Sequence, residues 1–248
     1  MHAASPALYN RPVPSPRKLH DKYFNQAKRE GYLARSAYKL IELDERHQVL
    51  PKGGKVLDLG CAPGSWLQVA HERVGRSGLV VGIDLKPVSP GVPDRVITVV
   101  GDFTEVPLED LIGPDGKGVG IGGFDSVISD MAPNTTGHGD HFRSVRLCET
   151  ILDRLPQLLR PGGTLVIKVL EGETFPELLK RLRAEFNVVR GCKPKASRDL
   201  SRETFVVAKW YRASHMSPPP LSASSPSPAP PSPPSAPPAE PDSAAEPP

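Results

Sequence analysis

Short runs of apolar residues alternate with longer segments of helical periodicity along most of the chain. The helical spacing of apolar side chains predicts helices over residues 18–29, 36–49, 65–74, 141–160 and 175–186. The apolar runs predict seven strands, over residues 55–60, 78–85, 96–101, 124–130, 164–170, 187–191 and 203–211. Apolar strands that alternate with helices are typical of an α/β fold around a buried sheet. We therefore expect a mostly parallel seven-stranded sheet flanked by helices.

The two ends of the chain differ from this pattern. Nearly every residue over 217–248 is Pro, Ala or Ser, which leaves too little apolar surface to offset the chain entropy lost on folding. We expect a flexible arm over residues 1–17, a folded domain over 18–212 and a disordered tail over 213–248. The chain has a net charge of +3, and the acidic residues of the tail make the remainder more basic still. That charge fits a polyanionic partner, although the charge taken alone is better explained by a solvated basic surface.

The composition also excludes several classes of protein. The three cysteines, Cys61, Cys148 and Cys192, are far apart and no His/Cys cluster has zinc spacing, so we predict buried thiols and no metal. No apolar run approaches the roughly 18 residues of a membrane span, and no secretory leader is visible. Four prolines within the first 16 residues disfavour the amphipathic helix of a mitochondrial transit peptide. We expect no membrane association, and bacterial cytoplasm in preference to the mitochondrial matrix.

A glycine-rich turn follows the first predicted strand. Residues 58–66 read Asp-Leu-Gly-Cys-Ala-Pro-Gly-Ser-Trp, in which Gly60 and Gly64 allow a ligand to approach the backbone without meeting a Cβ atom. The spacing differs from the G-x-G-x-x-G of dinucleotide sites and from a Walker A loop. Asp58 is either part of a ligand site or a structural acid that fixes the turn.

Acidic residues end the next three predicted strands. Asp84 stands where an acid can accept hydrogen bonds from ribose hydroxyls, and Asp102 with Phe103 suits an adenine ring. Asp130 ends the fourth strand. Each of these acids alone also fits a helix cap or an exposed surface. Because ligands of parallel sheets bind at the carboxyl ends of strands, the set predicts a nucleoside ligand with a charged or polar appendage.

Lys168 lies in the apolar run Leu-Val-Ile-Lys-Val-Leu of the fifth predicted strand. A lysine is rarely buried unless it is paired. Burial favours the neutral amine, which is able to act as a general base. The alternative is a structural lysine that reaches the strand end and binds a loop carbonyl.

These residues, in this order, resemble the FtsJ-type ribosomal RNA large-subunit methyltransferases, also called RlmE. The resemblance covers residues 18–211, and its motifs lie at residues 34–40, 58–66, 101–103, 129–134, 167–169 and 201–203. A glycine-rich insertion over residues 113–123 departs from the family pattern.

The resemblance implies a Rossmann-like S-adenosylmethionine-dependent methyltransferase fold, without a metal. It implies transfer of a methyl group to the 2′-hydroxyl of a uridine in the A-loop of 23S rRNA, in the assembled large (50S) ribosomal subunit. It assigns catalysis to Lys39, Asp130, Lys168 and Glu203. It assigns binding of S-adenosylmethionine to Gly64, Trp66, Asp84, Asp102 and Asp130. We expect a monomer.

Other functions remain compatible with parts of the sequence. A methyltransferase of transfer RNA or of an mRNA cap has similar chemistry, and a ribosome assembly factor can retain the fold. A nicotinamide-dependent oxidoreductase shares the glycine turn and Asp84 but leaves Asp102, Asp130 and Lys168 unexplained.

Two groups of basic residues are predicted to meet on one face and contact RNA phosphates. Aromatic residues interleave the first group and either stack on bases or pack against the domain, the second being the more ordinary role. The basic groups are Lys18, Lys22, Lys28, Arg29 and Arg35, and Lys193, Lys195, Arg198 and Arg202; the aromatic residues are Tyr23, Phe24 and Tyr32.

Overall fold

The computed structural model describes residues 17–111, 123–133, 139–197 and 201–213. Arg17, predicted to belong to the arm, is described and begins a helix. The rest of the predicted arm, most of the glycine-rich insertion and nearly all of the predicted tail lie outside these ranges. The helices are α1 (Arg17–Glu30), α2 (Ala37–His47), α3 (Ser65–Val74), α4 (Leu108–Leu111), α5 (Asp140–Leu158) and α6 (Phe175–Glu185). The strands are β1 (Lys55–Leu59), β2 (Leu79–Asp84), β3 (Ile97–Val100), β4 (Phe124–Ser129), β5 (Leu159–Leu170), β6 (Phe186–Cys192) and β7 (Glu203–Tyr211).

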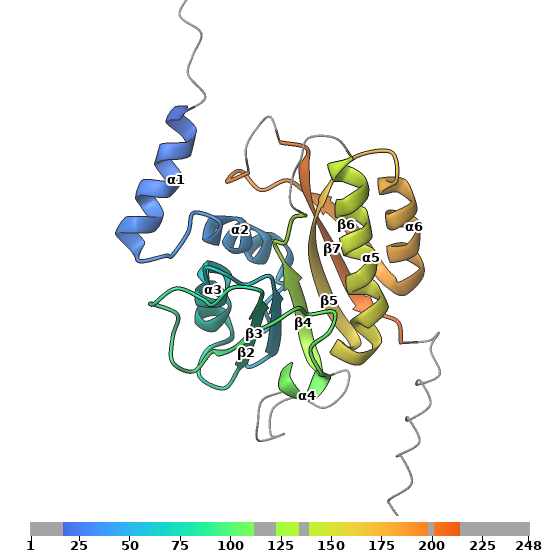
Figure 1. The fold of residues 1–248 in the computed structure, drawn as a ribbon, viewed down its shortest axis with the longest axis horizontal. Helices are drawn as coiled ribbons and strands as arrows, with labels where there is room; N and C mark the ends of the chain where they lie inside the picture. Colours follow the sequence, from blue (N-terminus) through green and yellow to red (C-terminus); the bar gives the residue numbers. More distant parts are fainter. Residues whose placement is uncertain (1–16, 112–122, 134–138, 198–200, 214–248) are drawn as a thin grey trace, which may run out of the picture. The chain divides into compact units, whose positions relative to one another are not determined.

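The strands form one seven-stranded sheet in the order β3-β2-β1-β4-β5-β7-β6 (Figure 1). Strands β1 to β5 pair in parallel, and only β7 pairs antiparallel to β5 and β6. The predicted α/β fold with a mostly parallel sheet of seven strands is therefore confirmed.

Helices cover both faces of the sheet. One core cluster joins the sheet to α5 and α6 through residues such as Ile151, Leu155 and Leu182, all of them buried. The other joins it to α2 and α3 through residues such as Leu40, Leu43 and Leu67. Figure 1 shows the two pairs of helices on opposite sides of the strands. Burial on both faces explains why the strands are apolar throughout.

The topology fixes where a ligand binds. From β1 the chain runs outward to β2 and β3 and then returns to β4 on the other side of β1. A crevice at the carboxyl ends of the strands is expected at such a switch point. Because β7 is antiparallel, its first residue, Glu203, lies beside Leu170 at the end of β5 and therefore at the same edge of the sheet.

Two local elements differ from the sequence prediction. The short helix α4 was not predicted, because four residues are too few to show helical periodicity. Strand β5 begins at Leu159, earlier than the predicted residue 164, because buried Leu159 pairs with Phe124 before the register shifts to the Ser126–Thr164 pair. The helix predicted over residues 141–160 accordingly ends at Leu158, and residue 160 lies in the irregular start of β5. No helix among the described residues has the length and hydropathy to cross a membrane.

Candidate active site

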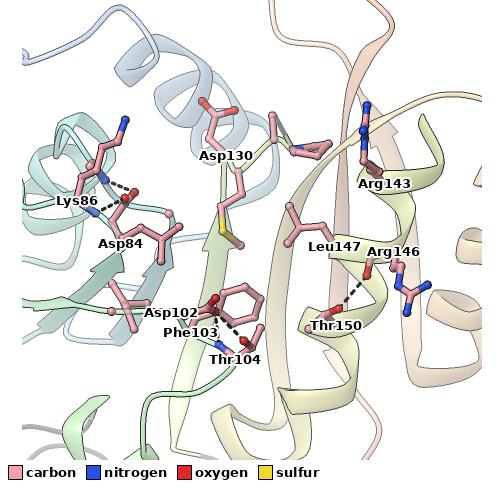
Figure 2. Close-up of a pocket in the computed structure, with 18 residues that line it drawn as sticks. Asp84, Lys86, Asp102, Phe103, Thr104, Asp130, Arg143, Arg146, Leu147 and Thr150 are labelled. Atoms are coloured by element: carbon pink, nitrogen blue, oxygen red, sulfur yellow. Dashed lines mark hydrogen bonds between the residues drawn. The ribbon is translucent and has the colours of Figure 1, made fainter. Parts of the chain in front are cut away.

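A cleft of about 690 Å³ opens at the carboxyl ends of β1 to β4. Its lining includes all three predicted strand-end acids, Asp84, Asp102 and Asp130, which Figure 2 shows around one space. Its volume lies in the usual range for a small-molecule site. The strand-end prediction therefore located a cavity with three carboxylates.

The carboxylate of Asp84 is held by the backbone. One oxygen accepts a hydrogen bond from the amide of Ala62 at 3.0 Å, and the other accepts one from the amide of Lys86 at 2.9 Å. A carboxylate has about four acceptor sites, so two remain for a ligand. The Ala62 contact ties the glycine turn after β1 to the end of β2. This geometry suits a pair of neighbouring hydroxyl groups, such as those of a ribose.

The second acid lies in a turn after β3. Asp102 accepts hydrogen bonds from the amide and the hydroxyl of Thr104, at 2.9 and 2.7 Å, and these bonds lower the pKa of its carboxyl. Arg154 of α5 binds the carbonyl oxygens of Phe103 and Val106 and so fixes the loop to the domain. Phe103 is mostly buried in the core and also contributes to the lining of the cleft.

The four residues that the resemblance assigns to catalysis form one connected cluster. Lys168 Nζ donates to Asp130 Oδ1 at 2.8 Å and also binds the carbonyl oxygen of Asp130. Lys39 Nζ lies 3.5 Å from the same Oδ1 and 2.7 Å from Glu203 Oε1. The cluster thus alternates in charge: Lys168, Asp130, Lys39, Glu203. Asp130 also lines the cleft, so the cluster borders the proposed nucleoside site.

The cluster is largely shielded from water, with the side chains of Lys39 and Lys168 9% and 10% exposed. Lys39 also lies over the ring of Phe205, 5.3 Å from its centroid. Burial strengthens each electrostatic contact and makes an unpaired charge costly. Two ammonium groups are tolerated so close together because Asp130 lies between them. The arrangement can hold a hydroxyl group beside Lys168 and move its proton.

Comparison with known proteins agrees with this geometry. Residues 32–211 match the family described as FtsJ-like methyltransferase. The chain belongs to this family. It is 47% identical over 191 residues to Ribosomal RNA large subunit methyltransferase E of Halorubrum lacusprofundi, which covers 76% of this chain and 70% of that protein. It is 45% identical over 198 residues to the protein of the same name from Syntrophobacter fumaroxidans, covering 79% and 98% respectively.

A solved structure shows the same likeness. The crystal structure of a ribosomal RNA methyltransferase from Plasmodium falciparum superposes with a TM-score of 0.62 at 31% identity, covering 73% of this chain and 98% of that one. The Rossmann-like methyltransferase fold predicted from the resemblance is therefore confirmed.

Two residues assigned to the cofactor lie away from the cleft of this FtsJ-like methyltransferase. A Cβ atom on Gly64 would lie 2.4 Å from a methyl group of Val92, so the close approach at Gly64 is made by the protein itself. Trp66 is 3% exposed and donates its indole N–H to the carbonyl of Ser36 at 2.9 Å. Its ring lies 5.8 Å from that of Phe205, behind Lys39. A contact of either residue with the cofactor stays a prediction.

At Gly60, by contrast, the close approach occurs at the cleft. A Cβ atom there would lie 2.0 Å from Met131 Cγ, and the φ of +78° is unfavourable for any other residue. We expect Gly60→Ala to destabilise the fold by more than the roughly 1–2 kcal/mol of a left-handed alanine, and to weaken cofactor binding. Gly31→Ala is the control, because Gly31 has a φ of +80° and nothing within 4 Å of the added carbon. If Gly60→Ala and Gly31→Ala lose the same stability in urea unfolding, the Met131 side chain moves aside at no cost and the prediction is wrong.

Burial raises the pKa of Glu203, but the charge and hydrogen bond of Lys39 outweigh it, so the pKa lies below its ordinary value of 4.5. Glu203 therefore stabilises the fold above pH 4.5, and this contribution disappears as the pH falls through the lowered pKa. We expect Glu203→Gln to be less stable than the wild type by about 1.5–3 kcal/mol at neutral pH, the usual worth of a charged hydrogen bond. The difference should shrink in acid. Exposed Glu173→Gln controls for the lost charge, and a constant difference from pH 6 to 3 would contradict the pairing.

Several cleft residues were missed in the sequence. Arg143, Arg146, Leu147 and Thr150 of α5 form the wall opposite Asp84 (Figure 2). Their three- and four-residue spacing is the same pattern that a helix uses to face the core, so no local signal distinguished them. Only the packing of α5 against β5 reveals that this face borders the cleft.

Asp58 lies beneath the cleft rather than in its lining. It is fully buried, and its Oδ2 has no hydrogen-bond partner among the described residues. Burial, and then the neighbouring charges of Asp130 and Asp84, raise the pKa of its carboxyl well above the usual value. A raised pKa favours the neutral, protonated carboxyl group at this position, which fits a structural acid beneath the glycine turn.

The predicted RNA-binding residues lie on both sides of α2, the helix that carries Lys39. Lys22, Lys28 and Arg29 are exposed on α1. The loop with Lys193 and exposed Lys195 reaches α2, where the amide of Lys195 donates to Glu42 at 2.7 Å. Arg198 and the side chain of Lys18 are not among the parts of the chain that the structure describes. A common RNA-binding face stays a prediction.

The aromatic residues of this region mostly pack. The rings of Tyr23 and Tyr32 lie 5.5 and 5.9 Å from that of Tyr38, and the Tyr32 hydroxyl donates to Glu72. Phe24, by contrast, is exposed.

All three cysteines are buried and free, as predicted. The described residues contain no group of His, Cys, Asp and Glu able to hold a metal ion.

Proposed function

We propose that this protein transfers a methyl group from S-adenosylmethionine to the 2′-hydroxyl of a uridine in the A-loop of 23S rRNA, in the assembled large ribosomal subunit. The observation that carries the proposal is the cluster of Lys168, Asp130, Lys39 and Glu203 at the border of a cleft with nucleoside-binding acids. The relatives named Ribosomal RNA large subunit methyltransferase E support the choice of RNA.

The cleft residues fit the methyl donor. The free acceptor sites of Asp84 suit the ribose hydroxyls of the donor, and the carboxylate of Asp102 suits an amino group of its adenine. Asp130 and the glycine turn line the remaining part of the cleft, which leaves room for the amino-acid portion of the donor. S-adenosylmethionine supplies an electrophilic methyl group, whose bond to sulfur breaks as the new bond to oxygen forms.

Lys168 is the proposed general base. In its neutral form Nζ takes the proton from the 2′-hydroxyl, and the oxygen keeps the electron pair of the O–H bond with which it attacks. The carboxylate and the carbonyl of Asp130 orient this amine. Lys39, itself held by Glu203, supplies positive charge for the developing oxyanion. Holding both reactants in place supplies much of the remaining rate, since effective molarity is worth roughly 7–11 kcal/mol.

Methyl transfer from labelled S-adenosylmethionine tests the proposal. The acceptors are large subunits that lack the modification, naked 23S RNA and transfer RNA, and the methylated ribose is mapped afterwards. We expect one labelled A-loop uridine, with the subunit as the best acceptor. Labelling of transfer RNA alone would overturn the substrate. No label in any RNA, with S-adenosylmethionine still bound, would favour an assembly role.

The remaining expectations belong to the same proposal. The protein acts as a monomer, through a domain of residues 18–212 between the arm 1–17 and the tail 213–248. It works in the bacterial cytoplasm, where its ribosomal substrate is assembled.

A further inference from the structure

An exposed tryptophan with an unusual backbone lies near the end of β7. Trp210 is 51% exposed and has a φ of +61°. A left-handed backbone is rare for a bulky residue, because its Cβ meets the neighbouring carbonyl oxygen. Residues held in strained backbone conformations concentrate at functional sites. Nothing in the methyl-transfer chemistry above uses Trp210.

Basic residues lie close to Trp210 in the chain, and one of them lies over its ring. Lys209 Nζ lies 5.8 Å from the centroid of the Trp210 ring and also donates to the carbonyl of His47 at 2.8 Å. On the other side, Arg212 Nε donates to Asn187 Oδ1 at 2.5 Å. The flanking pairs Phe186–Tyr211 and Val188–Lys209 place Asn187 beside Trp210 in the β6–β7 ladder.

Further basic groups extend the surface along β6 and α2. Burial lowers the pKa of His47, and the charges of Arg190, Arg46 and Lys209 lower it further, so these groups lie close enough to act on one ring. Arg46 is paired with Glu42 at 2.6 Å. Among the described residues no carboxylate forms an ion pair with Arg190, Lys209 or Arg212. We call this region the Trp210 surface; it consists of Arg46, His47, Arg190, Lys209, Trp210 and Arg212.

The Trp210 surface is far from the catalytic cluster. Trp210 follows Glu203 by seven residues along β7, which corresponds to about 23 Å at the usual rise of a strand. Glu203 lies at the edge of the sheet where the parallel strands end, so Trp210 lies toward the edge where they begin. A ligand here touches neither the methyl donor nor the target ribose.

We propose that the Trp210 surface is a second RNA-binding site, at which the indole stacks on an unpaired base while Lys209, Arg190 and Arg212 contact the flanking phosphates. An exposed aromatic ring among cations is the arrangement that binds single-stranded nucleic acid. A second copy of the chain would bring like charges together. The inference rests on the proposed function, because it supposes that the substrate is a large RNA able to reach both edges of the sheet.

Trp210→Ala tests the base stacking. We expect its affinity for unmodified large subunits and for 23S RNA to fall by about 5- to 150-fold, the usual range for one stacked base. KM for RNA should rise by the same factor, while kcat and S-adenosylmethionine affinity stay unchanged. Trp210→Phe retains an aromatic face and should restore most of the affinity. Trp210→Gly relieves the backbone strain, so it should bind RNA weakly while melting no lower than the wild type.

Arg190→Gln tests the phosphate contacts. Its plot of log affinity against log salt should be shallower by about 0.7–0.9, the value for one lost phosphate contact. Lys180→Gln, exposed on α6 away from this surface, should leave the slope unchanged. Iodide quenching adds a direct readout, because the chain has two tryptophans and Trp66 is buried. Trp210 should be quenched in the free protein and protected when 23S RNA is bound.

Unchanged RNA affinity of Trp210→Ala would overturn the inference, as would an indole already protected in the free protein, which would place the tail or a second copy on the surface. RNA affinity is measured without methyl transfer, so the experiments test the second RNA-binding site and the proposed methyl-transfer activity independently. Normal methylation with unaltered affinity of the variants removes the second site alone. Weakened affinity with no methylation of any RNA removes the proposed activity alone.

Discussion

Replacing Lys168 with alanine is expected to lower kcat for methyl transfer by about 10²–10⁴-fold, the usual contribution of a general base. Lys168 Nζ is fixed by the carboxylate and the carbonyl of Asp130, and its side chain is only 10% exposed, so water cannot readily take its place. Lys168 is not among the residues that line the cleft. Binding of S-adenosylmethionine should therefore survive.

The measurement is a single-turnover rate with saturating S-adenosylmethionine and unmodified large subunits, beside calorimetric titration of the cofactor. Exposed Lys180→Ala serves as the matched control for one lost lysine. If Lys168→Ala turns over at nearly the wild-type rate, the base is another group. Loss of cofactor binding in the variant would mean that Lys168 shapes the cleft instead.

The architecture was predictable because each element carries its own signal. Strands such as β1, with Val56, Leu57 and Leu59 fully buried, are apolar on both faces only when helices cover both sides of a sheet. The strand-end acids followed from the rule that parallel strands end at a common edge, which placed Asp84, Asp102 and Asp130 around one cleft. Local pattern and a topological rule were sufficient for these features.

Contacts between distant segments were not predictable from local pattern. Lys39 lies on an amphipathic helix, where a lysine ordinarily faces water, and Glu203 opens an ordinary strand. Only the resemblance singled them out, and the antiparallel pairing of β7 with β5 brings Glu203 to the site. For Lys168 the structure shows the carbonyl contact of the structural alternative, because its amine binds both the carboxylate and the carbonyl of Asp130, and the general-base role stays a prediction. Trp66 shows the reverse case, since this motif residue packs against Phe205 and is not among the residues that line the cleft.

Asp130→Asn is expected to lower both activity and stability, because Asp130 neutralises two buried lysines at once. Its Oδ1 lies 2.8 Å from Lys168 Nζ and 3.5 Å from Lys39 Nζ. An asparagine of nearly the same shape leaves two ammonium groups side by side with Glu203 as their remaining anion. Removal of one partner from a buried ion pair typically costs about 3–5 kcal/mol, and the partial exposure of Asp130 places this change at the lower end. Methyl transfer should fall by at least about 10²-fold, since the base loses its orienting carboxylate.

A second substitution separates the two effects. Lys39→Met removes one of the two ammonium groups that lose their carboxylate partner in Asp130→Asn, and it keeps an apolar side chain over the Phe205 ring. In the Asp130→Asn background it should recover much of the lost stability in urea unfolding, whereas alone it should destabilise, giving a coupling energy between the two positions. Activity should remain low in the double variant, because Lys168 is still unoriented and the positive charge of Lys39 is gone. Additive losses of stability would mean that Asp130 and Lys39 do not interact, and the alternating chain of charges that supports the proposed mechanism would then be broken at its centre.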